Sequence, residues 1–216
     1  MAPYARLEVT LILLIGGAAT IVAGILLHWW ALLPGILTLA LLMFYRDPSR
    51  TTPADDDLLL APADGKITKI EPDYRADGSD RRELRLVIFL SVLNVHINRS
   101  PCAGTVTEVK YNPGEFLNAL KPEATTRNEN NLVTIQPQPP LPGPIHVRQI
   151  AGVLARRVVC TLKSGDEVSA GERFGMIKLG SQTELRVPAD ARWEVRVAQG
   201  DSVKAGLTVL AWLKSP

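Results

Sequence analysis

Apolar residues are concentrated near the start of the chain. Residues 11–45 form a run of 35 positions without Asp, Glu, Lys or Arg. A single helix of that length would extend about 50 Å, well beyond the roughly 30 Å hydrocarbon core of a bilayer. The His-Trp-Trp run at 28–30 supplies a break, because tryptophan favours the boundary between headgroups and hydrocarbon. The pattern therefore predicts two helices, 11–27 and 31–45, that form an N-terminal hydrophobic membrane hairpin.

Basic residues flank this apolar segment on both sides. Arg6 precedes it, and Arg46 and Arg50 follow it. By the positive-inside rule, a hairpin would leave both of its ends in the cytoplasm. Residues 1–45 are therefore expected to anchor a domain of residues 46–216 on the cytoplasmic side of the cell membrane. A segment that dips into the bilayer without crossing it also fits, whereas the length of the run and Glu8 beside Arg6 disfavour a secretory signal peptide.

Beyond Arg46 the pattern changes to short apolar runs separated by glycine and proline. Five of these runs are typical of buried strands, namely 84–90, 104–109, 132–135, 147–150 and 153–161. Turn sequences such as Pro-Ala-Asp-Gly at 62–65 bracket them. Helix is expected only as a turn or two around 115–120. The sequence therefore predicts a mainly β domain.

A seven-residue pattern occurs twice, 35 positions apart. Residues 165–171 read Gly-Asp-Glu-Val-Ser-Ala-Gly, and residues 200–206 read Gly-Asp-Ser-Val-Lys-Ala-Gly. A Gly-Asp pair before a β-branched residue suits a tight turn into a strand, and the second glycine permits a positive φ. Such turns occur in barrel-sandwich hybrid folds, so the domain is expected to be of this kind. Lys178 lacks the flanking residues of biotinyl and lipoyl carriers, which disfavours a carrier function.

The composition excludes several classes of function. The 24 Lys and Arg residues nearly balance 22 Asp and Glu residues, which argues against nucleic acid as a partner because a binding groove needs a clustered positive excess. Cys102 and Cys160 lie 58 positions apart, and the histidines are His28, His96 and His146. None of these spacings is that of a metal site, so no metal is expected.

The pair Gly180-Ser181 lies between two apolar stretches rather than in a polar loop. A serine after glycine can attack the preceding carbonyl when the peptide is held strained and a base is near. From the spacing alone, an ordinary β-turn is the simpler interpretation. The pair becomes more informative when it is read together with other stretches of the chain.

Four stretches, in the same order, resemble motifs of the short-form phosphatidylserine decarboxylase family. Leu179-Gly180-Ser181 resembles its Leu-Gly-Ser self-cleavage motif. Residues 44–50 (Phe-Tyr-Arg-Asp-Pro-Ser-Arg) resemble the run that follows the family's membrane segment. Residues 61–65 (Ala-Pro-Ala-Asp-Gly) resemble its aspartate stretch, and residues 89–101 resemble its histidine segment. Residues 128–131 and 149–157 add weaker support. The resemblance covers most of the chain from 44 to 188.

The resemblance implies a pyruvoyl-dependent enzyme that makes its own cofactor. Ser181 would attack the carbonyl of Gly180, and the chain would be cut between them into a β chain (1–180) and an α chain (181–216) that stay associated. The pyruvoyl group left at position 181 would form a Schiff base with phosphatidylserine and release CO2. The product would be phosphatidylethanolamine, made at the surface of the lipid bilayer.

The family likeness also suggests roles for three side chains. His96, oriented by Asp64, would be the general base, since an imidazole can both take and return a proton at neutral pH. Longer members of the family carry a second histidine where this chain has Arg99, which could instead bind the phosphate or carboxylate of the substrate. Two alternatives stay open: a non-catalytic membrane-anchored adaptor, and a pyruvoyl decarboxylase of another serine-headgroup lipid. The oligomeric state, including a homo-oligomer, is also open.

Overall fold

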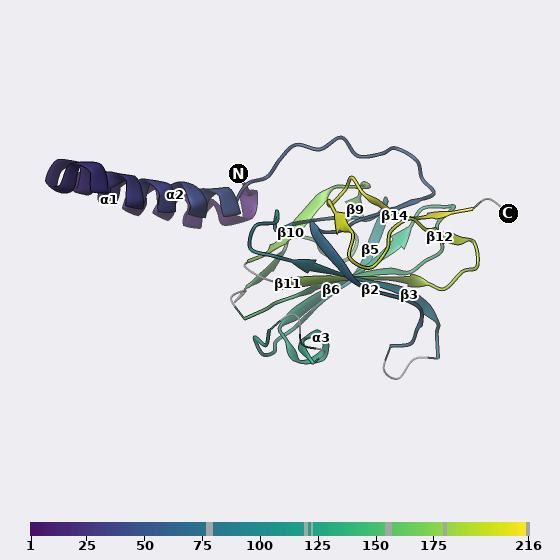
Figure 1. Ribbon diagram of the computed structural model, residues 1–216. Helices are drawn as coiled ribbons and strands as arrows, with labels where there is room; N and C mark the ends of the chain where they lie inside the picture. Colours follow the sequence, from purple (N-terminus) through teal and green to yellow (C-terminus); the bar gives the residue numbers. More distant parts are fainter. Residues whose placement is uncertain (77–79, 119–120, 122, 154–156, 179–180, 215–216) are drawn as a thin grey trace. The chain divides into compact units, whose positions relative to one another are not determined.

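The computed structural model describes residues 1–76, 80–118, 121, 123–153, 157–178 and 181–214. The chain divides into two compact units, Met1–Ser49 and Arg50–Pro216. The first is helical and the second consists mainly of strands (Figure 1). The predicted fold class, a mainly β domain after an apolar helical N-terminal segment, is confirmed.

The first unit is an antiparallel helical hairpin. It comprises η1 (Pro3–Ala5), α1 (Arg6–Leu27), η2 (His28–Ala31) and α2 (Leu32–Phe44). The predicted break lies at His28, whose φ of 51° ends α1. Gly16 faces Thr38 and Gly24 faces Ala31, so the two helices run in opposite directions and approach closely at small residues. By length and composition alone, the helical segment Pro3–Phe44 could cross a membrane.

The second unit is built from antiparallel strands. They are β1 (Leu58–Leu60), β2 (Gly65–Tyr74), β3 (Glu83–Leu90), β4 (Ile97–Arg99), β5 (Gly104–Asn112), β6 (Asn130–Pro137), β7 (Ile145–Ile150), β8 (Val158–Cys160), β9 (Glu167–Val168), β10 (Arg173–Ile177), β11 (Ser181–Pro188), β12 (Trp193–Val195), β13 (Ser202–Val203) and β14 (Val209–Leu213). The described helix of this unit is the short α3 (Ala124–Arg127), which lies later in the chain than the helical turn expected around 115–120. Residues 119 and 120 of that turn lie outside the described residues.

One large sheet faces two small ones. The large sheet has the strand order β13-β2-β3-β11-β7-β6-β5-β9, and the small ones are β1-β14-β12 and β4-β10-β8. The predicted strand at 153–161 is the exception among the five predictions: β8 covers only Val158–Cys160, Val153 lies in a bend, and 154–156 lie outside the described residues. The other four predicted runs lie within β3, β5, β6 and β7.

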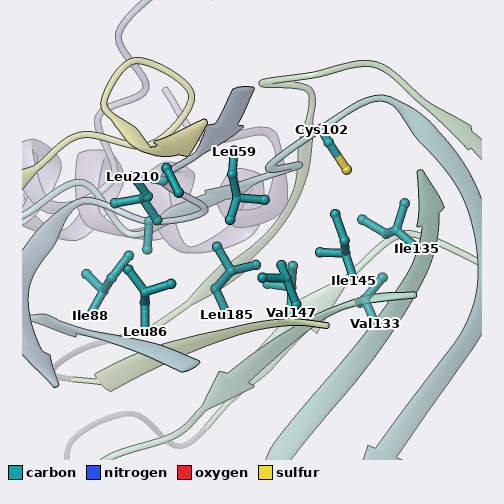
Figure 2. Close-up of a cluster of buried hydrophobic side chains, with 14 of the residues drawn as sticks. Leu59, Leu86, Ile88, Cys102, Val133, Ile135, Ile145, Val147, Leu185 and Leu210 are labelled. Carbon is teal, nitrogen blue, oxygen red and sulfur yellow. The ribbon is translucent and has the colours of Figure 1, made fainter. Parts of the chain in front are cut away.

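The hydrophobic core fills the space between the large sheet and the strands that cover it. Figure 2 shows Leu86, Val147 and Leu185 of the large sheet pointing toward Leu59 and Leu210 of the small sheet β1-β14-β12. These side chains are fully buried. Because successive residues of a strand point to opposite faces, the odd-numbered positions of β11 face this core.

The two copies of the repeated pattern adopt matching turns. Gly165 and Gly200 have φ values of 96° and 101°, and Gly171 and Gly206 have φ values of 73° and 67°. In each copy the aspartate after the first glycine accepts a backbone N–H bond of 2.8 Å from three residues earlier. All four positions lie in the left-handed region that favours glycine, so the repeat has the structural role expected from the sequence.

Candidate active site

Ser181 is the first residue of β11, the strand at the centre of the large sheet. It pairs with Leu90 of β3, and its side chain is fully buried. Its Oγ has no hydrogen-bond partner within the part of the chain that the structure describes. A buried hydroxyl without a partner is costly, and a catalytic role is one explanation for such a group. Leu179 and Gly180, the other residues of the predicted cleavage motif, lie outside the described residues.

His96 lies at the same end of the sheet as Ser181. Its carbonyl oxygen accepts a 3.2 Å hydrogen bond from the backbone of Ile177, at the end of β10. Ser181 comes four positions after Ile177 in the chain, so their Cα atoms are at most about 14 Å apart. The His96 ring is fully buried. The fold therefore brings the predicted nucleophile and the predicted base into one neighbourhood.

The tautomer of His96 is set by the main chain. Nδ1 lies 2.9 Å from the carbonyl oxygen of Asn94, which can only accept a hydrogen bond. Nδ1 therefore carries the proton of the neutral ring, and Nε2 carries the lone pair that a general base requires. Asn94 is itself fixed, because its Oδ1 accepts 2.8 Å hydrogen bonds from the N–H and the hydroxyl of Ser91.

Asp64 binds Arg50, and its role in orienting His96 stays a prediction. Its carboxylate accepts hydrogen bonds of 2.6 and 2.8 Å from the Arg50 guanidinium and one of 2.8 Å from the backbone of Ala205. The physical reason is that Arg50 presents a planar fork of donors that matches a carboxylate. Arg50 is buried in this pair, so its charge serves the fold of the second unit rather than only marking the membrane boundary.

Arg99 is also held inside the fold. Its side chain is buried, and one guanidinium nitrogen donates a 3.0 Å hydrogen bond to the carbonyl of Gly171. A Cβ added to Gly206 would lie 3.0 Å from Arg99 Cδ. Arg99 therefore packs where the two repeated turns meet, and its role toward the substrate stays a prediction.

A chain of buried amide side chains was missed by the sequence reasoning. Asn98, next to Arg99 on β4, donates a 3.0 Å hydrogen bond to the hydroxyl of Thr183 on β11. Gln149 donates to Asn98 at 2.9 Å and accepts from Asn131 at 3.2 Å. This chain ties the strand that begins with Ser181 to β4, β7 and β6. The one sequence signal was Gln149, a polar residue inside the predicted buried run 147–150.

A second buried polar cluster lies on the opposite face of β11. Glu184 accepts a 2.6 Å hydrogen bond from Arg85, and Arg186 lies 3.2 Å from it. Burial, followed by the positive charges of Arg186 and Arg148, lowers the pKa of His146 to about 4. His146 is therefore neutral at pH 7, and this cluster points away from Ser181.

Comparison with known proteins identifies the class to which this fold and site belong. Residues 37–211 match the family model described as phosphatidylserine decarboxylase. Two relatives, each named phosphatidylserine decarboxylase proenzyme, come from Wolbachia sp. subsp. Brugia malayi (strain TRS) and Wolbachia pipientis wMel. Each is 43% identical over 178 residues, which is 81% of this chain and 76% of the relative.

The chain therefore belongs to the phosphatidylserine decarboxylase family. It is an enzyme of the carboxy-lyase class. The resemblance stated from the sequence motifs is confirmed.

Proposed function

We propose that this chain is a self-cleaving proenzyme that decarboxylates phosphatidylserine to phosphatidylethanolamine. The observation that carries the proposal is Ser181: a fully buried hydroxyl, without a partner among the described residues, at the start of a central strand and directly after a glycine. A family model over most of the chain and relatives named as proenzymes support the same assignment.

Maturation would begin at the bond between Gly180 and Ser181. The Ser181 hydroxyl attacks the Gly180 carbonyl, and the acyl group moves from nitrogen to oxygen to give an ester. Removal of the Cα proton of residue 181 then expels the Gly180 carboxylate and leaves dehydroalanine. Addition of water and loss of ammonia convert this residue into a pyruvoyl group. The His96 Nε2 lone pair is suited to accept the protons in these steps.

Residue 181 fits a pyruvoyl group because the site is buried and because its side chain makes no hydrogen bond to any described residue that conversion would break. Such a group supplies a ketone that forms a Schiff base with the serine amine of the lipid and accepts the electron pair as CO2 leaves. The protein provides the surroundings: His96 can return a proton to the substrate Cα, while Asp64 and Arg50 hold the neighbouring Pro62–Gly65 turn in place.

The two chains produced by cleavage would remain one folded body. The 36-residue α chain (216 − 180) would include β11 to β14. β11 pairs with β3 along eight positions and with β7 along five, while β13 and β14 pair with β2 and β1. Every one of these partners belongs to residues 1–180. Ladder hydrogen bonds and a shared core therefore hold the fragments together without the peptide bond.

The N-terminal unit suits a substrate that exists only in a bilayer. We assign residues 1–45 to membrane anchoring and residues 46–216 to catalysis. Arg6 and Arg46, at the two ends of the apolar segment, favour a cytoplasmic location for the catalytic part. Anchoring raises the effective concentration of the enzyme at the lipid surface.

Mass spectrometry of the purified protein tests the processing step. The proposal predicts a 180-residue chain and a 36-residue chain with a pyruvoyl-blocked N-terminus. Ser181→Ala should remain one chain and be inactive. Ser100→Ala is the matched control, because Ser100 is another fully buried serine, with its hydroxyl bonded to the Cys102 carbonyl at 2.6 Å. It should still be cut.

Two outcomes would overturn the assignment. An intact wild-type chain that releases no CO2 from phosphatidylserine would instead favour the membrane-anchored adaptor. A cut chain that turns over only another serine-headgroup lipid would keep the chemistry and replace the substrate. For the base, normal cleavage and turnover in His96→Ala would remove His96 from the site.

A further inference from the structure

The exposed apolar side chains of the second unit are unevenly distributed. Within its described residues, the large hydrophobic side chains that are exposed number five: Val92, Leu93, Tyr111, Phe116 and Val153. All of them come from loops or strand ends rather than from the faces of the sheets. Scattered single residues of this kind need no explanation, but a cluster at one place marks an interaction surface.

Strand register places these residues at the end of the large sheet where β11 begins. Ser181 pairs with Leu90, and Val92 and Leu93 follow directly in the chain. Gln182 pairs with Ile150, which lies three positions before Val153.

The same register extends across the neighbouring strands. Ile150 pairs with Asn130, and Asn130 pairs with Asn112, next to Tyr111. Phe116 belongs to the adjoining segment, where Asn128 binds the backbone of Leu117. We call these five exposed residues the apolar rim.

The opposite end of the sheet differs. There β11 ends at Pro188 beside Glu83 of β3, and β7 begins at Ile145. None of the exposed large hydrophobic residues in the described part of the unit lies at that end.

The most exposed member of the rim is joined rigidly to the candidate base. The side chain of Leu93 is 79% exposed. It sits in a turn closed by the hydrogen bond from the Asn94 N–H to the Ser91 carbonyl, at 3.0 Å, and by the two bonds from Ser91 to the Asn94 side chain. The carbonyl of Asn94, the last residue of this turn, accepts the hydrogen bond from His96 Nδ1. The position of Leu93 is therefore fixed relative to the catalytic neighbourhood.

Charge at the rim is compatible with an anionic surface. Among the described residues of the segments that carry Phe116 and Val153, three exposed basic residues (Lys121, Arg127 and Arg157) outnumber two exposed acidic ones (Glu115 and Glu123). Glu115 is paired with Arg127 at 2.7 Å. Basic side chains beside inserted apolar ones are the combination that binds anionic lipid headgroups. The candidate substrate is itself an anionic lipid.

We propose that the apolar rim of the second unit inserts into the surface of a bilayer that contains anionic lipid, so that the site at Ser181 opens toward the membrane. This rests on the proposed function, because a diacyl substrate must bring its headgroup to Ser181 while its acyl chains stay in an apolar environment. The N-terminal hairpin would bring the enzyme to the membrane, and the apolar rim would determine which face of the second unit contacts the bilayer.

Depth-dependent quenching tests the contact directly. The full chain carrying Leu93→Cys is labelled with an environment-sensitive fluorophore and reconstituted into phosphatidylcholine–phosphatidylserine vesicles with or without doxyl-labelled lipid. Burial raises the pKa of the Cys102 thiol to about 12, which keeps that cysteine unreactive near neutral pH, and an unsubstituted chain corrects for labelling at Cys160. Ala191→Cys, exposed at the opposite end of β11, is the matched control.

The expected result is a blue shift and quenching at position 93, with neither at position 191. Equal quenching at both positions, or none at 93, would overturn the proposal. A blue shift at 93 in detergent that depends on protein concentration would show that a second copy of the chain covers the rim, and it would overturn the proposal as well.

Activity gives a second, independent measurement. Leu93→Glu should lower the rate on bilayer phosphatidylserine by about tenfold or more, the loss expected when a leucine-sized apolar contact is replaced by a charge. The rate on monomeric short-chain phosphatidylserine should not change, and Ala191→Glu should alter neither rate. Equal losses on both substrates would reject a docking role. If the wild-type protein acts on neither lipid, the proposed function fails while the quenching result still decides whether the rim docks.

Discussion

The buried pair between Arg50 and Asp64 allows a quantitative test of the fold at the candidate site. The Arg50 side chain is 5% exposed and that of Asp64 10% exposed. Arg50 donates two hydrogen bonds to the carboxylate and a third, at 2.6 Å, to the carbonyl of Ala205. Replacing Arg50 by methionine removes all three and leaves a carboxylate that is buried with one backbone donor.

The cost follows from this geometry. Breaking a buried ion pair by removing one partner destabilises a protein by about 3–5 kcal/mol. For a domain the size of Arg50–Pro216, each kcal/mol lowers the melting temperature by about 2–4 °C. Arg50→Met should therefore lower the melting temperature by about 6–20 °C. The double change Arg50→Met with Asp64→Leu should recover most of this loss, because no buried charge remains unpaired.

The assay is thermal unfolding in detergent of proteins that also carry Ser181→Ala, so that every variant is compared as one uncut chain. Arg82→Met is the matched control, since Arg82 pairs with Asp73 at 3.4 Å while both side chains are largely exposed. Exposed pairs contribute about 0–1 kcal/mol. If Arg50→Met and Arg82→Met lower the melting temperature equally, the structural role assigned to the Arg50–Asp64 pair is refuted.

Three further predictions concern other parts of the second unit. The folded-state pKa of His146, about 4, lies below the usual 6.5, so neutral His146 contributes fully to stability above about pH 6.5 and this contribution is lost as the pH falls toward 4. His146→Gln should therefore reduce the pH dependence of the free energy of unfolding between pH 6.5 and 4. An unchanged slope of that free energy against pH would contradict this. Asn98→Ala leaves the hydroxyl of Thr183 without its donor. It should lower the free energy of unfolding, measured by chemical denaturation, by about 1–3 kcal/mol, and it should slow cleavage. A variant as stable and as well processed as wild type would contradict this. Gly206→Ala should lower the melting temperature more than Gly200→Ala, since both have positive φ but only Gly206 is crowded, by Arg99; equal shifts would show that crowding is unimportant there.

The parts of the fold that the sequence predicts well are those set by local patterns. The run that gives β3 is apolar apart from Arg85, and the His-Trp-Trp break is a local feature of the N-terminal segment. The repeated turns depend on glycine at fixed offsets, and their φ values agree within a few degrees between copies. The run 153–161 misled the prediction because its described apolar residues lie in a bend, at Val153, and in a three-residue strand, at Val158–Cys160.

The contacts around the candidate site could not be predicted from the sequence. The likeness to the motifs of the family suggested Ser181, His96 and Asp64, whereas the partners of these residues depend on how distant segments meet. Asp64 binds Arg50, 14 positions earlier, and His96 binds the carbonyl of Asn94. Main-chain carbonyls are present at every position, so no sequence pattern distinguishes the one that fixes an imidazole.

The central place of β11 in the large sheet has a consequence for the lifetime of the enzyme. An uncut chain refolds as a single molecule, with its last strands always tethered to their partners. If the bond before Ser181 is broken, as proposed, a denatured molecule can recover only when two separate polypeptides meet again, and that encounter slows with dilution. The mature form should consequently be assembled once, and heat or denaturant should inactivate it irreversibly under conditions from which the precursor recovers.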